Sequence, residues 1–470
     1  MFAKIQRVHF VGIGGIGMSG IAEVLLNLGY KVSGSDLKPS PVTDRLGGMG
    51  AAIFAGHNAD NVAGADVVII SSAITHDNVE VAAAHQRHIP VIQRAEMLAE
   101  LMRLKYGIAI GGMHGKTTTT SMVAAVLAAG GLDPTVVVGG RVDAMGSNAR
   151  LGKSQYLVAE ADESDRSFLK LSPILAVVTN IDREHMDCYR DMEDVKSAFR
   201  EFMDRVPFYG MVVACNDNDH LRALLPTVQR RIVTYGSREG SDFRISNVCC
   251  GPRENNAALS RFRVSYCGGD LGEFHLRVPG EHNVMNATAA IAVGVGLDVP
   301  AEKIREALAN FSGVDRRFQR IGAANGVTVI DDYGHHPTEI SATLAAARQC
   351  GFCKVHVIFQ PHRYTRTQLL LEEFATAFHD ADSLCLLDIY PASEPPIPGI
   401  TSELLANRIA NSGDQKAVYL SSFAGAVKRV VSAATPGDMI LTLGAGSVSQ
   451  LGPRILEKLE SRVVSRANDL

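Results

Sequence analysis

The stretch from Ile110 to Thr120 constrains the fold of this chain more than any other feature. It reads Ile-Gly-Gly-Met-His-Gly-Lys-Thr-Thr-Thr-Thr, after an apolar run at 106–110 and before an alanine-rich helical pattern at 121–129. Small residues between a strand and a helix let backbone N–H groups face an anion at the helix N-terminus. The stretch therefore predicts a phosphate-binding loop in an α/β domain.

This loop is shorter than the common pattern G-x-x-x-x-G-K-[ST], because Ile110 stands where that pattern has its first glycine. We expect Lys116 to reach the β- and γ-phosphates of a nucleotide, and the Thr117 hydroxyl to ligate Mg²⁺. The shortened loop narrows the families to which the chain can belong.

Length and composition indicate a globular protein. The chain has 470 residues, of which 46% are hydrophobic and 20% charged, so we expect about three domains with full cores. The formal net charge of −4 gives no basic field for nucleic acid. No apolar run approaches the roughly 20 residues that span a bilayer, and the start lacks the pattern of a signal peptide. The eight cysteines are scattered, which favours reduced thiols, and we expect a cytoplasmic protein.

Strand and helix patterns divide the chain into three α/β units in series: a Rossmann-like domain at 1–105, a P-loop ATPase-like domain at 106–315 and a second Rossmann-like domain at 316–470. The strands predicted for them are 8–11, 31–35, 67–71 and 90–92; 106–110, 135–138, 156–159, 176–179 and 211–214; and 327–330, 355–359, 384–387 and 439–443. We also expect helices at 21–28, 97–103 and 283–295, and an antiparallel appendage between about 230 and 280.

A second glycine-rich turn, Gly12-x-Gly14-x-x-Gly17, follows the first predicted strand. It matches the dinucleotide fingerprint, with Asp36 placed where a ribose hydroxyl would bind. The motif indicates a diphosphate-bearing nucleotide at a helix start without specifying which one, and it also suits a tight turn with no ligand. An NAD enzyme would need groups for hydride transfer, and the sequence offers no obvious set.

Carboxylates and a histidine follow two further strands of the second unit. Glu160 comes directly after the strand at 156–159, in the run Glu-Ala-Asp-Glu-Ser-Asp, and we expect it to hold Mg²⁺ beside the phosphate loop. His185 follows the strand at 176–179, on the ligand side of a parallel sheet, and could ligate a second Mg²⁺. By itself, a single histidine is more often structural.

Polar clusters also follow two strands of the third unit, at 331–337 and 359–367. Arginines in such clusters suit bidentate capture of a carboxylate or phosphate. Arg316-Arg317-Phe318 precedes this unit and is a candidate phosphate clamp. A surface ion-pair network stays open as the alternative for any single arginine.

Together these motifs resemble those of the Mur ligase family, most closely its alanine-adding members. The motifs run in the family's order from residue 8 to residue 367, and no single one is specific. They are Gly12–Gly20, Gly112–Thr120, Glu160–Asp165, Asn180 with His185, Pro279–Ala287, Arg316–Phe318, Asp331–Glu339 and Phe359–Thr367. The remaining residues fit the family's C-terminal domain.

The resemblance implies an ATP-dependent ligase of peptidoglycan synthesis that joins L-alanine to the lactyl carboxylate of UDP-N-acetylmuramate through an acyl phosphate. It implies ATP and Mg²⁺ as cofactors, these two compounds as substrates, and a monomer or a homodimer without nucleic-acid or membrane partners. A carboxylate acylates an amine only after its oxygen becomes a good leaving group, and cations spread the charge of each step.

The resemblance also assigns roles to single residues. The residues that it implies for ATP binding are Gly112, Met113, His114, Gly115, Lys116, Thr117, Thr118, Asn283, Asn286, Arg317 and Asp332. The residues that it implies for catalysis are Lys116, His185, Arg317 and Asp332. The residues that it implies for metal binding are Thr117, Glu160 and His185. For the UDP substrate it implies Gly14, Gly15, Ile16, Gly17, Asp36, His57 and Ser71, and for the L-alanine carboxylate His335, Arg363 and Arg366.

Two positions depart from the family pattern. Met113 stands where the family usually has threonine, which removes a hydroxyl near the phosphates but leaves the backbone donors. Arg200 stands where some relatives carry a carbamylated lysine, which alanine-adding members also lack.

Three alternatives remain. A murein-peptide recycling ligase would act on the same nucleotide sugar, although Gly334 and the residues Gly12 to Gly15 favour the alanine-adding members. An oxidoreductase would change the absorbance of a nicotinamide cofactor, and a nucleotide sensor would bind ATP without turnover that depends on an amino acid.

Overall fold

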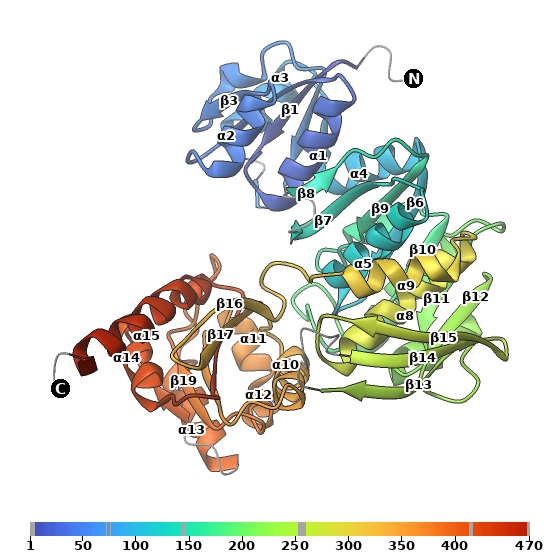
Figure 1. Cartoon of the computed structure of the whole chain (residues 1–470). Coiled ribbons are helices and arrows are strands. Elements are labelled where there is room, and N and C mark those ends of the chain that lie inside the picture. The colour runs from blue at the N-terminus through green and yellow to red at the C-terminus, as the bar shows by residue number, and fades with distance from the viewer. Residues whose placement is uncertain are drawn as a thin grey trace. The chain divides into compact units, whose positions relative to one another are not determined.

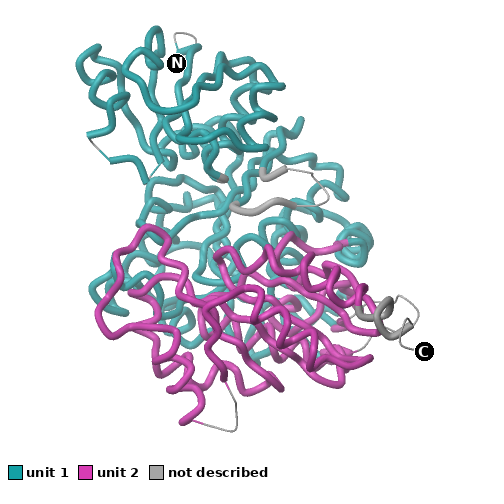
Figure 2. The backbone as a smooth tube through the Cα atoms, turned by 90° about the vertical axis from the view of Figure 1, so that its left-hand side faces the viewer, with its two compact units in different colours: residues 1–246, 263–272, 285–310 teal, residues 247–262, 273–284, 311–470 magenta. Residues whose placement is uncertain are grey.

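The computed structural model describes residues 5–71, 73–75, 77–142, 147–251, 260–412 and 417–467. The chain forms two compact units (Figure 2). Unit 1 comprises residues 1–246, 263–272 and 285–310, and unit 2 comprises residues 247–262, 273–284 and 311–470. Among the described residues, no helix is long and apolar enough to cross a membrane.

The first sheet of unit 1 is parallel and has the strand order β3-β2-β1-β4-β5 (Figure 1). Its strands are β1 (Arg7–Val11), β2 (Lys31–Asp36), β3 (Ala52–Ala55), β4 (Val67–Ile70) and β5 (Val91–Gln93). Its helices are α1 (Ile16–Asn27), α2 (Pro41–Gly48) and α3 (Val79–Gln86), with a 3₁₀ helix at Ala59–Val62, and α4 (Arg94–Arg103) follows β5. All residues of β4 are buried, as expected where helices cover both faces.

Two details of this sheet differ from the prediction. The first helix begins at Ile16 rather than Ile21, because the turn at 12–14 leads directly to Gly15, which is the N-cap. The strand β3 was not predicted, since it is a short edge strand whose side chains are mostly exposed and show no apolar alternation.

The second sheet has ten strands in the order β15-β14-β13-β12-β11-β10-β6-β9-β7-β8. They are β6 (Tyr106–Gly111), β7 (Thr135–Val142), β8 (Ser147–Arg150), β9 (Tyr156–Glu160), β10 (Leu175–Val178), β11 (Met211–Cys215), β12 (Ile232–Gly236), β13 (Phe243–Cys250), β14 (Ser260–Tyr266) and β15 (Gly269–Leu276). The helices are α5 (Lys116–Ala129), α6 (Met192–Asp204), α7 (Asp219–Leu224), α8 (Glu281–Gly296) and α9 (Ala301–Asn310), with 3₁₀ helices at Ser167–Lys170 and Leu225–Thr227. The predicted antiparallel appendage is partly wrong, because β12 pairs in parallel with β11 and the later strands extend the same sheet.

The third sheet lies in unit 2 and has the order β16-β17-β21-β18-β19-β20, in which only the β16–β17 pair is antiparallel. Its strands are β16 (Gln319–Ala324), β17 (Val327–Asp332), β18 (Val355–Phe359), β19 (Ser383–Leu386), β20 (Ala417–Tyr419) and β21 (Met439–Leu443). Its helices are α10 (Pro337–Gln349), α11 (Tyr364–Leu369), α12 (Leu371–Thr376), α13 (Ser402–Ser412), α14 (Phe423–Ala433) and α15 (Leu451–Ala467), with a 3₁₀ helix at Ser447–Gln450.

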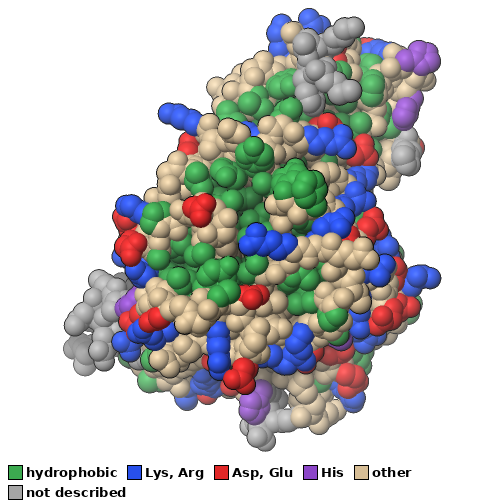
Figure 3. Space-filling model, turned by 90° about the vertical axis from the view of Figure 1, so that its right-hand side faces the viewer, with side chains coloured by type: hydrophobic (Ala, Val, Ile, Leu, Met, Phe, Trp, Pro, Cys, Tyr) green, Lys and Arg blue, Asp and Glu red, His purple; other side chains and the backbone are tan. Residues whose placement is uncertain are grey.

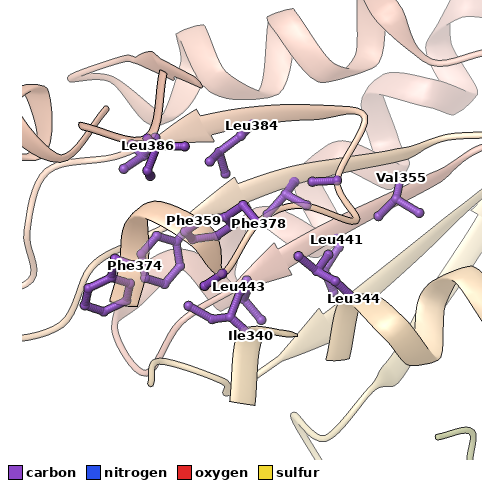
Figure 4. Packing of buried hydrophobic residues seen from close by; sticks show 14 of the residues in the cluster. Ile340, Leu344, Val355, Phe359, Phe374, Phe378, Leu384, Leu386, Leu441 and Leu443 are labelled. Carbon is purple, nitrogen blue, oxygen red and sulfur yellow. The ribbon is translucent and has the colours of Figure 1, made fainter. Parts of the chain in front are cut away.

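One core cluster of unit 2 packs α10, α12 and α13 against this sheet (Figure 4). Phe359 of β18 lies at its centre, with ring centroids 5.8 Å from Phe374 and 5.1 Å from Phe378. All three rings are fully buried. This packing holds the carboxyl ends of β17, β18 and β21 in place, and polar loops follow the first two of them.

The surface carries charges of both signs. Figure 3 shows Lys and Arg side chains interspersed with Asp and Glu over one face, in keeping with the formal net charge of −4.

We predict that Phe378→Ala lowers the stability of unit 2 by about 3–5 kcal/mol, because it leaves a cavity beside Phe359. Urea unfolding followed by circular dichroism measures the loss. Leu369→Ala is the control, since Leu369 is 43% exposed and should change little. Equal effects of the two substitutions would contradict this account of the core.

Candidate functional site

The carboxyl ends of three neighbouring strands meet at one edge of the second sheet. In the strand register, Ile110 of β6 lies opposite Glu160 of β9, and Gly111 lies opposite Val178 of β10. The loops that follow these strands therefore begin at the same level. This edge is where open α/β sheets bind ligands.

The phosphate loop joins β6 to α5 through two glycines that no other residue could replace without strain. Gly112 has φ +131°, and a Cβ there would lie 2.0 Å from Thr179 Oγ1. Gly115 has φ +82°, and a Cβ there would lie 2.6 Å from Asn286 Oδ1. Gly115 is the N-cap of α5, so the helix begins at Lys116, earlier than the predicted 121. Thr117 and Thr118 consequently lie in the first helical turn, whose N–H groups suit an anion.

Asn180, which lies two residues after β10, holds the phosphate loop in place through hydrogen bonds. The Asn180 side chain accepts from the His114 N–H at 2.9 Å and donates to the His114 carbonyl at 3.0 Å. The His114 ring lies 2.8 Å from Asp182. Met113 is buried, and its N–H donates to the Asn180 carbonyl at 3.3 Å. The Met113 N–H thus has a partner inside the protein, and binding of phosphate by the backbone donors of this loop stays a prediction.

Lys116 is bound within the loop by three acceptors. Its Nζ donates to the Gly112 carbonyl at 2.7 Å, to the Met113 carbonyl at 3.1 Å and to Glu163 Oε1 at 2.7 Å. Burial works to lower the pKa of Lys116, but the Glu163 carboxylate outweighs it, so this pKa is raised. Lys116 is therefore an ammonium ion placed at the helix start, ready for an anionic ligand.

The predicted metal ligands lie around this lysine. Glu160 is partly buried at the end of β9 and lines the same cavity as Lys116. His185, with φ +56°, places its Nε2 3.5 Å from Glu163 Oε1. Carboxylate, hydroxyl and imidazole groups are available here from Glu160, Thr117 and His185, and the two oxygen types are those that Mg²⁺ prefers. The donor set fits a hard divalent cation.

A cavity of about 350 Å³ lies beside Lys116 in unit 1. It is lined by Gly15, Gly17, Met18, Ser71, Arg94, Leu98, Lys116, Val137, Val138, Glu160 and Asp162. Three of the residues predicted for the UDP substrate, Gly15, Gly17 and Ser71, thus share one cavity with Lys116 of the phosphate loop and with the carboxylates of Glu160 and Asp162. The volume lies within the range of small-ligand sites.

Arg94 and Asp162, which both line this cavity, form an ion pair with each other. The Arg94 guanidinium lies 3.1 Å from the Asp162 carboxylate, and a Cβ on Gly17 would lie 2.9 Å from Arg94 Nη1. Burial works to raise the pKa of Asp162, but the Ser164 hydroxyl, Lys116 and Arg94 outweigh it and lower that pKa. The cavity therefore carries two cations, each opposite a carboxylate.

The other residues predicted for the UDP substrate lie outside this lining. Asp36 accepts from the Gly14 N–H at 2.9 Å, so it shapes the glycine turn itself. His57 Nδ1 lies 3.0 Å from Ser35 Oγ and 3.4 Å from the buried Glu80. This nitrogen therefore contacts polar side chains inside the domain. For Ile16 the structure describes only the backbone, at the start of α1.

Within unit 2, the Asp332 carboxylate organises the loops that follow β17 and precede β16. Its two oxygens accept from the N–H groups of Phe318 and Gly334, each at 2.7 Å. Burial raises the pKa of Asp332 in spite of nearby Arg317. The Arg317 guanidinium lies 3.5 Å from Glu339 and 5.2 Å from the Tyr333 ring centroid. Direct contact of either residue with ATP stays a prediction.

The residues predicted for L-alanine gather around His362. The His335 ring centroid lies 5.7 Å from that of His362, and Arg366 Nη1 donates to the His362 carbonyl at 3.0 Å. Arg363 has φ +71° and places its Nε 3.8 Å from Glu394 Oε1. The structure thus brings His335 and Arg366 together through a histidine that the sequence did not single out.

The two asparagines predicted for the adenine side are both buried. Asn283 donates to the Pro279 carbonyl at 2.7 Å. Asn286 accepts from the Thr119 hydroxyl at 3.1 Å and so supports the start of α5. A role for either in nucleotide binding stays a prediction.

Sequence reasoning missed Glu163, Arg94 and the bracing role of Asn180. Glu163 stands three residues beyond Glu160 in the same acidic run, and only its 1% exposure separates it from solvated neighbours such as Asp165. Arg94 is the first residue of α4, in a segment without a motif. The acidic run was the one available signal for Glu163.

Three family profiles match the chain: "Mur ligase family, catalytic domain" at residues 7–106, "Mur ligase middle domain" at 110–294 and "Mur ligase, glutamate ligase domain" at 316–446. The chain belongs to the Mur ligase family. The predicted three-domain α/β fold class is thereby confirmed as that of a Mur ligase.

Several relatives are similar to this chain in sequence over almost its full length. UDP-N-acetylmuramate–L-alanine ligase of Koribacter versatilis is 73% identical over 466 residues, covering 99% of this chain and 100% of the relative. The enzyme of the same name from Acidobacterium capsulatum is 63% identical, covering 98% and 100%. The crystal structure of UDP-N-acetylmuramate–alanine ligase from Thermotoga maritima superimposes with a TM-score of 0.80 at 30% identity, covering 97% of this chain and 99% of that one.

We predict that Glu80→Gln lowers stability at pH 7 by up to about 3 kcal/mol and that this difference shrinks as the pH falls from about 5 toward 2. Burial works to raise the pKa of Glu80, but hydrogen bonds from His9, Ser35, Asn61 and the Asn58 N–H lower it to about 2. A carboxylate whose pKa is lower in the folded than in the unfolded state stabilises the fold. This contribution is fully present at pH values above the unfolded pKa and is lost as the pH falls through the folded pKa.

Urea unfolding at pH 7, 5, 4 and 3 measures this dependence. Glu100→Gln serves as the control, because Glu100 makes only a surface pair with Arg103 and should show a small difference at every pH. A Glu80→Gln difference that does not change with pH would contradict the assigned ionisation.

Proposed function

We propose that this chain is an ATP-dependent ligase that joins L-alanine to the lactyl carboxylate of UDP-N-acetylmuramate in peptidoglycan synthesis. One observation carries the proposal: the glycine turn suited to the UDP pyrophosphate and the Lys116 loop suited to ATP line a single cavity. A carboxylate attached to the nucleotide sugar could there meet the phosphate that is to be transferred. The full-length relatives named for this activity support the substrate assignment.

The residues of unit 1 would act mainly by positioning and charge. The N–H groups at the start of α5 and the Lys116 ammonium would hold the ATP phosphates, and Lys116 would follow the transferred group. The first glycine turn would hold the UDP pyrophosphate against the start of α1. Holding the carboxylate and the phosphorus in line makes an encounter of two charged groups effectively intramolecular.

Thr117, Glu160 and His185 would hold Mg²⁺, which when bound neutralises charge on the phosphate oxygens. Arg94 would offset the negative charge of the substrate carboxylate at the cavity wall, since its guanidinium already lies beside Asp162 there. ATP, nucleotide sugar and amino acid are cytoplasmic metabolites, and we propose that compartment for the reaction.

For the amino acid we propose the cluster around His362 in unit 2, with His335, Arg363 and Arg366. A guanidinium binds the L-alanine carboxylate bidentately, which leaves the amine for attack on the acyl phosphate. The ammonium group of L-alanine loses one proton to become a nucleophile and a second as the amide N–H forms, and phosphate is the leaving group.

The recycling ligase is the weaker candidate. A murein peptide ligase from Psychrobacter arcticus superimposes with a TM-score of 0.69 at 24% identity, covering 97% of this chain, and this likeness shows the fold alone. The Thermotoga maritima enzyme is closer in both fold and sequence. Accepting a tripeptide in place of L-alanine is the property that would distinguish the two.

We predict phosphate release that requires ATP, Mg²⁺, UDP-N-acetylmuramate and L-alanine together, and its loss in Lys116→Ala with retention of UDP-N-acetylmuramate binding. Removing the ammonium takes away the cation on the transferred phosphate. A coupled phosphate assay and calorimetric binding of the nucleotide sugar provide the two measurements.

Lys303→Ala is the matched control, because Lys303 forms a surface pair with Glu306 on α9 and should leave release unchanged. Phosphate release that is independent of L-alanine would overturn the proposed activity. Loss of nucleotide-sugar binding in Lys116→Ala would show that the two sites are misplaced.

We predict that Arg366→Lys lowers kcat/KM for L-alanine by about 10- to 100-fold with the KM for ATP unchanged, because an ammonium cannot replace a bidentate guanidinium. Steady-state kinetics with varied L-alanine measure the effect. Arg348→Lys is the control, since Arg348 pairs with Asp382 at 2.9 Å on α10. An equal fall in the two variants would argue against the alanine pocket.

A further inference from the structure

Glu163 is a buried carboxylate at the phosphate loop that the proposed set of ligands does not include. Its side chain is 1% exposed. Its Oε1 lies 2.7 Å from Lys116 Nζ and 3.5 Å from His185 Nε2. Glu163 therefore contacts both the lysine predicted to bind phosphate and the histidine predicted to bind metal.

The second oxygen of this carboxylate has no hydrogen-bond partner in the part of the chain that the structure describes. Buried carboxylate oxygens are normally satisfied by a donor or by a cation. Lys116 occupies only Oε1, so Oε2 retains its full capacity to accept. Oε2 therefore offers one oxygen ligand for a divalent cation, in a carboxylate whose other oxygen lies 3.5 Å from His185 Nε2.

The backbone around Glu163 is braced. The Tyr189 hydroxyl donates to the Glu163 carbonyl at 2.7 Å, and the Arg166 N–H donates to the same carbonyl at 3.0 Å. The Arg166 guanidinium in turn lies 4.6 Å from the centroid of the Tyr189 ring. These contacts keep the carboxylate pointed at Lys116 and His185 rather than toward solvent.

We propose that Glu163 is the counter-ion of Lys116 in the nucleotide-free enzyme and becomes a ligand of the divalent cation beside His185 when nucleotide phosphate takes over Lys116. The inference rests on the proposed function only in that Lys116 binds nucleotide phosphate. A phosphate that draws Lys116 away leaves Glu163 as a buried, unpaired charge, which is unfavourable. A cation shared with the phosphate restores the balance, so nucleotide and metal would bind cooperatively.

Two binding measurements on Glu163→Gln test the proposal, because it predicts weaker binding of the metal without weaker binding of the metal-free nucleotide. Calorimetry with ADP in excess chelator should show affinity equal to or higher than that of wild type, because Lys116 is released from its carboxylate. Electron paramagnetic resonance with Mn²⁺ and ADP should show about 10-fold or greater loss of Mn²⁺ affinity, the range found when metal-site partners are removed.

Asp165→Asn is the matched control, because Asp165 lies two residues along in the same acidic run, is exposed and keeps its oxygen for the Ser167 N–H. It should bind Mn²⁺ and ADP as wild type does. Glu163→Asp provides a second variant that keeps the charge, and it should fall between wild type and Glu163→Gln in Mn²⁺ affinity.

Unchanged Mn²⁺ affinity in Glu163→Gln would overturn the proposal. A parallel loss of metal-free ADP binding and of Mn²⁺ binding would also overturn it, since that is what a merely structural residue would cause. Neither measurement uses L-alanine or the nucleotide sugar. A failure of the ligase activity would therefore leave this result standing, and the reverse also holds.

Discussion

The register of β9, β6 and β10 is the constraint on which the site depends. Because these strands are parallel and paired residue for residue, Glu160, the Gly111–Gly112 turn and Thr179 arrive at one edge of the sheet together. A slip of one residue in any strand would turn its side chains to the other face. The loops can then be short, and Lys116, Asn180 and His185 meet without long excursions of the chain.

Charge is balanced inside the site before any substrate arrives. Lys116 faces Glu163, and Arg94 faces Asp162. Such pairing keeps buried charges tolerable and holds the side chains in position. Under the proposed function, substrate phosphates and carboxylates would compete with these internal partners, and part of their binding energy would go into replacing the pairs.

Much of the fold and of the site was predictable because glycines and periodicity report on the backbone directly. The phosphate loop, the central strands and the strand-end positions of Glu160 and His185 follow from patterns of this kind. The edge strands β3, β8, β16 and β20 could not be predicted in this way, since strands of three to six residues are too short to show a clear periodicity. The contacts of Glu163 and Arg94 depend on tertiary packing, which gives a carboxylate its partner without marking the sequence around it.

The position of Met113 has a consequence for recognising phosphate loops. Its side chain points into the protein and is 4% exposed, while its N–H is held by the Asn180 carbonyl. A threonine at this place is therefore not required by the geometry of the turn, and an apolar residue fills the interior equally well. Sequence signatures that insist on a hydroxyl at this place would pass over chains whose loops are built in the same way.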